Sequence, residues 1–368
     1  MQARSRERAS DIHRKLLPCL SMPEMLLATP LNASHASRPY TFSDGISIRE
    51  LSPILWDISI AKTFISEHER EELAKTRYWL SASKEVEYLP GDVGNDLYEN
   101  AQQAMSALQI LCPTGAKNIF LMFHNTEQGY DNIGSLRPKE LCSTLLGRAI
   151  RLEQQGLEQD FDAIYRGVRR AFTEKIVRLQ NPILLLGHGA QICNVTLGAL
   201  MFVMALDMLM MAGEKAAFVE RVGGFVGPHS FVFPPDSLMN RQPAVKVQDV
   251  LADLYELRSI VAHGQEIPKI PYRQKYNLID DNGGQINLDD YYYAELMLES
   301  GLFLLTGVLR RISVDGLLDQ MREEAKWRSN LRLYEHRWKN CAFAATQHRG
   351  KPHRPNRVPM PEEGENQQ

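Results

Sequence analysis

One apolar run constrains the fold of this chain more than any other feature. It covers residues 190–211, and after Gln191 near its start it is interrupted only by Asn194, Thr196 and Asp207. Its length approaches the roughly twenty largely apolar residues that a membrane span needs. However, Asn194 and Asp207 would be costly in lipid, and no basic cluster flanks either end. We therefore predict the fully buried central helix of a helical bundle, with a membrane anchor as the alternative.

Segments with helical periodicity lie on both sides of this run. Apolar residues mark a long amphipathic helix over residues 161–179 that ends before Pro182. Residues 223–243 are rich in Gly and Pro and are predicted to form a loop. Further helices are predicted over residues 214–222, 290–312 and, with Asp315 as the N-cap, 315–327. Together these segments predict an all-helical domain over residues 149–327.

The segment 245–264, VKVQDVLADLYELRSIVAHG, is the helix on which we expect any chemistry to occur. Its apolar residues recur at steps of one, three and four, as on one buried face of a helix. Gly264 follows at the point where a helix commonly ends in the left-handed conformation that glycine adopts most easily. The last turns carry Arg258 and His263, a permanent cation and a titratable imidazole, on an otherwise apolar segment.

The first part of the chain is less regular. Residues 1–39 are polar and contain four prolines, so we predict a disordered leader with at most a short helix near residues 12–20. Residues 40–148 form a predicted N-terminal domain of unknown role. It is expected to be mostly helical, with helices over residues 66–79, capped by Ser66, and 97–111. The apolar run 119–123 fits a short strand or a buried helix equally well.

Charge and cysteine usage narrow the class of protein. The formal net charge of −3 does not favour nucleic acid as a partner, but a basic run begins at Arg322. We predict that residues 328–368 form a basic, largely disordered tail, and contact with a phosphate backbone is the alternative. The five cysteines are widely spread, with no CxxC pair and no histidine at zinc spacing. We therefore expect reduced thiols, no metal, no cofactor, no export signal and a cytoplasmic location.

Arg258 and His263 share the spacing R-x4-H, which Arg8 and His13 also show by chance. Around the second pair the sequence resembles the HEPN domains, specifically the Apea-like HEPN group. The resemblance depends on LYELRSIVAHG, on ALDMLM at residues 205–210 and on LRRI at residues 309–312, in this order and spacing. It covers roughly the second half of the chain and leaves the first 148 residues unexplained.

The resemblance implies a mainly α fold with a C-terminal HEPN-type bundle and a metal-independent endoribonuclease activity. By this resemblance, His263 of this chain would act as the acid or base on the ribose 2′-hydroxyl or the 5′-oxygen. Arg258 would stabilise the charge on the phosphoryl oxygens. Ser259 and Asp207 would support them. The resemblance further implies RNA as substrate, a homodimer, a role in defence or in a toxin–antitoxin system, and a neutralising protein partner.

Two other interpretations stay open. The domain could be a non-catalytic HEPN module that binds RNA, a nucleotide or a protein. Alternatively, Arg258 forms a structural salt bridge to Asp207, Asp253 or Glu256, and His263 is an ordinary residue of the helix end. Five residues of ideal helix turn through about 500°, which leaves the two side chains roughly 140° apart. They converge only if the helix loosens at its end.

Overall fold

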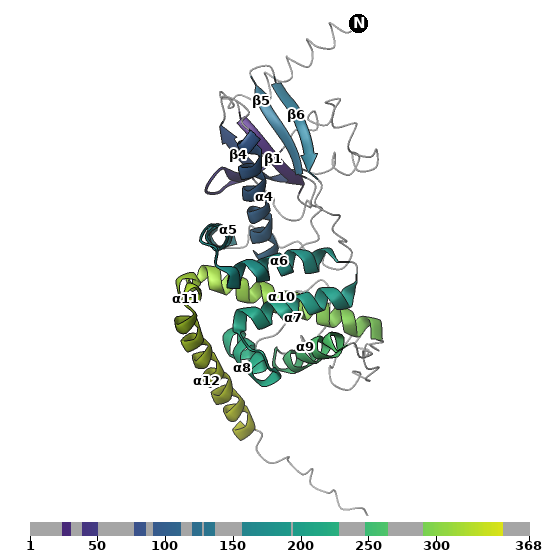
Figure 1. Ribbon diagram of the computed structural model, residues 1–368, viewed down its shortest axis with the longest axis vertical. Coiled ribbons are helices and arrows are strands. Elements are labelled where there is room, and N and C mark those ends of the chain that lie inside the picture. Colours follow the sequence, from purple (N-terminus) through teal and green to yellow (C-terminus); the bar gives the residue numbers. More distant parts are fainter. Residues whose placement is uncertain are drawn as a thin grey trace, which may run out of the picture.

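The protein is mainly helical, with a small β-sheet near its N-terminus (Figure 1). The mainly α prediction is confirmed at this level. The computed structural model describes residues 24–30, 39–50, 77–85, 91–111, 120–126, 129–136, 157–192, 194–227, 247–263 and 290–348. Within these ranges one hydrophobic core continues from Ile48 in the sheet to Leu331 in the last helix. The predicted boundary between residues 148 and 149 lies outside the described residues.

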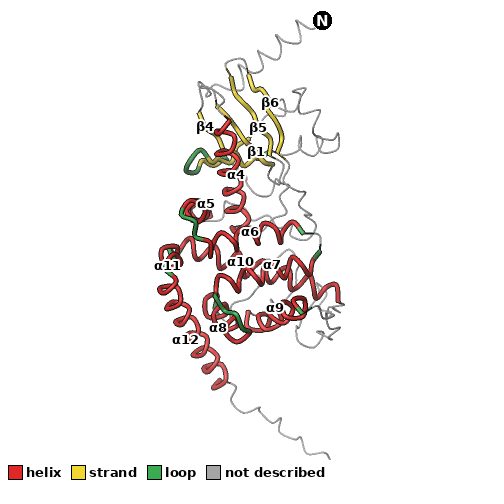
Figure 2. The backbone as a smooth tube through the Cα atoms, in the orientation of Figure 1, coloured by secondary structure: helices red, strands yellow, loops and turns green. Residues whose placement is uncertain are grey.

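The sheet has six strands in the order β2-β3-β4-β1-β5-β6, with antiparallel neighbours throughout (Figure 2). β1 lies in its middle, where Leu27 is opposite Ala82 of β4 on one side and Met122 of β5 on the other. Helix α4, Gly91–Leu111, packs against the sheet and against the helical bundle. The strands are β1 Glu24–Pro30, β2 Tyr40–Thr41, β3 Ile46–Glu50, β4 Tyr78–Glu85, β5 Phe120–Thr126 and β6 Gly129–Leu136.

This sheet corrects the predictions for the N-terminal region. In its described residues the region is built mainly around a sheet and is not mostly helical, and β1 lies within the predicted disordered leader. Tyr78 and Trp79 belong to β4, so the predicted helix 66–79 is wrong at its end, and residues 66–76 lie outside the described part. The predicted helix 97–111 is confirmed as part of α4, and the run 119–123 falls largely in β5.

The turn between β2 and β3 joins the sheet to helix α5, Leu157–Thr173. Asp44 and Gly45 at its tip both have positive φ angles, and a Cβ atom on Gly45 would lie 2.2 Å from the Ser83 carbonyl oxygen, so only glycine fits there. Asp44 forms an ion pair with Arg169 of α5. Ser43 Oγ donates a 2.8 Å hydrogen bond to Asp162 of the same helix.

The bundle is assembled around helices α7 and α10. α10 contacts α4, α5, α7, α8 and α9, and α7 lies between α6, α9 and α10 (Figure 1). The helices after α5 are α6 Val177–Gln191, α7 Val195–Met210, α8 Lys215–Val226, α9 Val247–Ala262, α10 Asp290–Val314, α11 Leu318–Arg322 and α12 Glu324–His348. The predicted helices 290–312 and 214–222 correspond to α10 and α8, although α8 continues through Gly223 and Gly224 into the predicted loop.

The predicted helix 161–179 is two helices. Lys175 has a left-handed φ of 53°, which breaks the chain between α5 and α6. Pro182 lies inside α6 and does not end it. Proline lacks the amide that would bond the carbonyl four residues earlier, so α6 continues with one hydrogen bond fewer.

The apolar run 190–211 is also divided. Asn194 accepts the Leu197 amide at 3.0 Å as the N-cap of α7, and Ala190 belongs to α6. α7 is not fully buried, since Leu197 and Met204 are 42% and 41% exposed. In the described residues no single helix is long and apolar enough to span a membrane, although α7 and α8 pass that test as a pair bent by 81°.

The predicted disordered tail is wrong up to His348, because α12 is helical to that residue. Trp327, Leu331, Tyr334 and Trp338 recur at helical spacing and pack against the core. Gly223 and Gly224 of α8 lie beneath Trp338 and the Tyr334 backbone. The predicted helix 315–327 is likewise replaced by a turn, α11 and the start of α12. Residues after 348 lie outside the described part.

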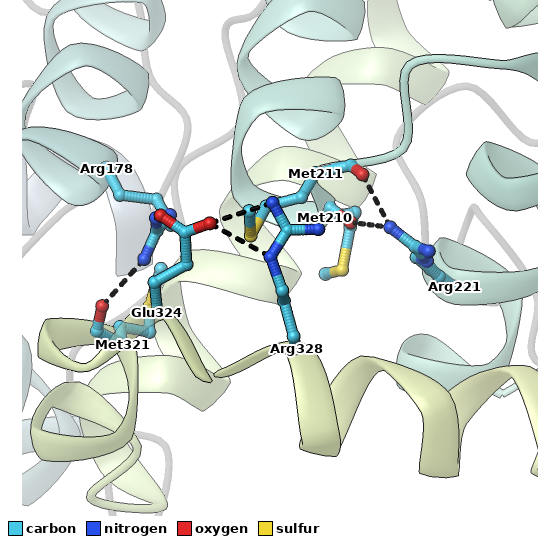
Figure 3. Close-up of polar contacts among 7 residues, drawn as sticks. All are labelled: Arg178, Met210, Met211, Arg221, Met321, Glu324 and Arg328. Atoms are coloured by element: carbon cyan, nitrogen blue, oxygen red, sulfur yellow. Dashed lines mark hydrogen bonds and ion pairs between the residues drawn. The ribbon is translucent and has the colours of Figure 1, made fainter. Parts of the chain in front are cut away.

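Polar contacts lie close to the C-terminal end of α7, where Arg221 of α8 reaches the backbone of Met210 and Met211 (Figure 3). Arg221 of α8 donates to the carbonyl oxygens of Met210, at 2.9 Å, and of Met211. Trp327 Nε1 donates to the Leu209 carbonyl at 2.7 Å. These donors satisfy carbonyl groups that a helix end leaves without intrahelical partners. They therefore fix α12 and α8 to the end of α7.

Candidate functional site

The candidate site lies on the last turns of α9. The apolar side of this helix is packed into the core, with Val247, Val250, Leu251 and Leu254 fully buried. Val261 packs partly against the same core. The predicted buried face is thus confirmed, and it orients the rest of the helix. Arg258, Ser259 and His263 are carried on this fixed frame.

Arg258 is paired with Asp207, at the end of α7. Its Nη2 atom lies 3.2 Å from Asp207 Oδ2, and the two side chains are 31% and 14% exposed. Arg258 Nη1 also donates to the Tyr255 hydroxyl at 2.9 Å, one turn earlier on α9. The salt bridge anticipated for Arg258 therefore forms, and Asp207 is its partner among the three acids considered. The guanidinium is held but is still reachable from solvent.

The pair belongs to a closed ring of hydrogen bonds between α9 and the turn after α7. Asp207 Oδ1 accepts the Gly213 amide at 3.0 Å, and the Tyr255 hydroxyl donates to the Gly213 carbonyl at 2.9 Å. Gly213 has a left-handed φ of 71°. A Lys215–Glu256 ion pair at 2.6 Å joins α8 to α9 beside this ring. Asp207 thus both balances the charge of Arg258 and stabilises the turn.

His263 is placed differently. It is exposed directly after α9, and its side chain makes no hydrogen bond or ion pair with other described residues. Its amide donates to the Ser259 carbonyl at 3.0 Å, so helical geometry continues up to His263 and the helix does not loosen there. Arg258 and His263 therefore leave α9 about 140° apart, and one chain does not bring them together. Ser259 is half-buried beside Arg258. Gly264 lies outside the described residues.

Sequence reasoning missed two members of this site, Tyr255 and Gly213. Tyr255 lies three residues before Arg258, a spacing that puts both on one side of a helix, but its apolar ring reads as core. Its ring does pack on Phe218, at 5.3 Å between centroids. The role of Gly213 depends on the contact between the turn after α7 and α9, and no local sequence pattern indicates this contact.

No cluster of three or more His, Cys, Asp or Glu side chains able to hold a metal ion occurs within the part of the chain that the structure describes. Comparison of the chain with protein-family models, with curated proteins and with solved structures finds no match. The assignment of a function therefore depends on the residues and on the geometry of α9.

Proposed function

We propose that this chain is a metal-independent endoribonuclease of the HEPN type, with His263 as the group that transfers protons. The observation that carries the proposal is an exposed imidazole at the end of a rigidly packed helix, five residues after an arginine that is itself partly exposed. Imidazole is the side chain best suited to exchange protons near neutral pH. A guanidinium matches the geometry of a phosphate.

The proposed reaction is attack by the ribose 2′-hydroxyl on the adjacent phosphate. The 2′-oxygen forms a bond to phosphorus, and its proton passes to an imidazole. The bond from phosphorus to the 5′-oxygen breaks, and that oxygen receives a proton. The products are a 2′,3′-cyclic phosphate and a 5′-hydroxyl end. The nucleophile is part of the substrate, so an acid–base group and a cation that stabilises the pentacoordinate phosphoryl group suffice.

The geometry of α9 adds a requirement. Because Arg258 and His263 diverge on one chain, the proposal includes a homodimer that brings the pairs of two chains to one cleft. Arg258 would also have to exchange its bond to Asp207 for one to the phosphate. The defence role and a neutralising protein partner belong to the same proposal and are supported by the resemblance of LYELRSIVAHG and its neighbours to HEPN sequences.

The test is cleavage of a mixed RNA pool in the presence of a chelator. Wild-type protein is compared with His263→Ala and with His188→Ala, which removes another exposed histidine, on α6. We expect wild type and His188→Ala to release fragments with cyclic phosphate ends, and His263→Ala to lose at least the roughly 100-fold that general acid–base catalysis contributes. Equal cleavage by all three proteins would refute the assignment of His263.

A second candidate is a non-catalytic module that binds RNA, and the Arg258–Asp207 pair favours it. An arginine that is neutralised and hydrogen-bonded in the free protein serves the fold without any substrate. In this case the protein would bind RNA without cutting it. Arg258→Gln would then lower stability, and the length distribution of the RNA pool would not change on incubation with wild-type protein.

A further inference from the structure

Helix α12 lies on the outside of the bundle and extends beyond it (Figure 1). Its contacts with other elements are mainly with α8 and α11. The side that faces α8 carries Trp327 and Leu331, which are 0% and 1% exposed. The opposite side is open to solvent from Arg328 to Asn340. α12 therefore presents one long surface that is exposed to solvent.

That surface is basic. Arg328, Arg332, His336 and Lys339 recur at steps of four, four and three, which places them along one side of a helix. All four are exposed. We call them the α12 basic stripe. Successive members are separated by about one turn, or roughly 4.5–6 Å along the axis.

The charge of this stretch is not balanced locally. Residues 325–361 contain nine Lys and Arg and one acid, Glu335, so their formal charge is +8 in a chain whose total is −3. Glu335 is held by Arg221 of α8 at 2.6 Å, on the buried side of α12. Within the stripe, Arg332 has no carboxylate partner among the described residues. The ion pairs of Arg328 with Glu324 and of Lys339 with Glu220 are solvent-exposed, and such pairs contribute at most about 1 kcal/mol.

We propose that the α12 basic stripe binds the phosphate backbone of single-stranded RNA. This proposal rests on the proposed function, because the proposed function identifies the polyanion as RNA. Three permanent cations, Arg328, Arg332 and Lys339, lie within about three turns of one side of the helix, and such a row suits a repeating charge without sequence readout. An anionic membrane is a poorer fit, because a helix that lies in a membrane surface inserts an apolar face, and the apolar face of α12 is buried against α8.

The test measures binding separately from cleavage. A fluorescent 2′-O-methyl RNA oligonucleotide has no free 2′-hydroxyl, so it can be bound but not cut by 2′-hydroxyl attack. Its affinity for the full chain is measured by anisotropy over a range of salt concentrations. The variant is Arg328→Gln with Arg332→Gln, in which Glu324 keeps its bond to Arg178 at 3.2 Å. The control is Arg77→Gln with Arg166→Gln, which removes two arginines that are 66% and 63% exposed elsewhere.

For two lost phosphate contacts we expect the slope of log K against log salt to shrink by about 1.4, since each contributes about 0.7 for single strands. Over the tenfold range from 1 M to 0.1 M salt, a slope smaller by 1.4 corresponds to an affinity at 0.1 M that is about 25-fold lower than that of wild type. The loss should be equal for unrelated RNA sequences. The control should keep the wild-type slope. An unchanged slope in the α12 variant, an equal change in the control, or binding to phosphatidylserine vesicles but not to RNA would overturn the proposal. None of these outcomes depends on cleavage by His263.

Discussion

The close packing of α12 on α8 gives a sharp prediction for Gly224→Ala. A Cβ atom at Gly224 would lie 2.0 Å from the Tyr334 carbonyl oxygen and 2.6 Å from its carbonyl carbon. Ordinary contact begins at 3.4 Å, so the α12 backbone would have to move away by about 1.4 Å. The obstacle is main chain, which cannot rotate aside as a side chain can. Gly307 of α10 is the matched control, because a Cβ atom there meets nothing within 4 Å.

The two substitutions should have opposite signs. Alanine favours a helix over glycine by about 1 kcal/mol, and Gly307→Ala should gain roughly that amount. Gly224→Ala has the same intrinsic gain, but overpacking typically costs about 1–3 kcal/mol, and any gap that opens weakens the burial of Trp327 and Trp338. We expect a net loss of about 2 kcal/mol, so the two variants should differ by about 3 kcal/mol.

Urea unfolding followed by tryptophan fluorescence measures this difference directly. Trp327 and Trp338 both lie on α12 and face the core, so their emission reports on its docking. Far-UV circular dichroism shows whether helix content changes with it. If Gly224→Ala proves as stable as Gly307→Ala, then α12 does not contact α8 through this glycine and the reasoning is refuted.

Two further predictions concern other parts of the fold. The first is a double-mutant cycle of Asp207→Asn with Arg258→Gln, measured by urea unfolding. The two side chains are 14% and 31% exposed, so the coupling free energy should lie between the values for exposed and buried pairs, at about 1–2 kcal/mol. A coupling free energy below about 0.3 kcal/mol would contradict the pairing. Burial raises the pKa of Tyr165 to about 12, above its usual value of about 10, so stability should fall by up to about 3 kcal/mol as the pH rises from about 10 to about 12. Tyr165→Phe should lose this pH dependence, and an unchanged alkaline profile in the variant would refute it.

The spacing of apolar residues predicted the helices of the bundle wherever one face of the helix is mainly apolar. α9 and α10 follow their periodicity closely. α12 was missed because its sequence contains seven charged residues and only four core residues, which lie between Trp327 and Trp338, and composition then indicates a solvated tail. The sheet was missed because β1 is defined by pairing with β4 and β5, which lie about fifty and about ninety residues further along the sequence.

The candidate site was predicted in part. A salt bridge of Arg258 was the alternative to its catalytic role, with Asp207, Asp253 and Glu256 equally available by sequence. The choice of Asp207 depends on how α7 crosses α9. The exposure of His263 follows from its position directly after the end of α9, three residues beyond the last buried residue, Ile260. Asn194 was read as a costly polar residue within one long helix, whereas it begins a new helix as its N-cap. In each case the residue type indicated a polar interaction, but the sequence did not identify the partner.

The ring around Gly213 bears on whether Arg258 can act on RNA. A half-buried guanidinium with no counter-ion would be costly, so Asp207 allows the free protein to fold with Arg258 in place. Asp207 also accepts the Gly213 amide and therefore keeps a partner when Arg258 moves away. Replacing one oxyanion by another at the same guanidinium exchanges similar charge-assisted bonds. Under the proposed function, Asp207 thus stabilises the resting site without preventing its use, provided that phosphate approaches the exposed third of the Arg258 side chain.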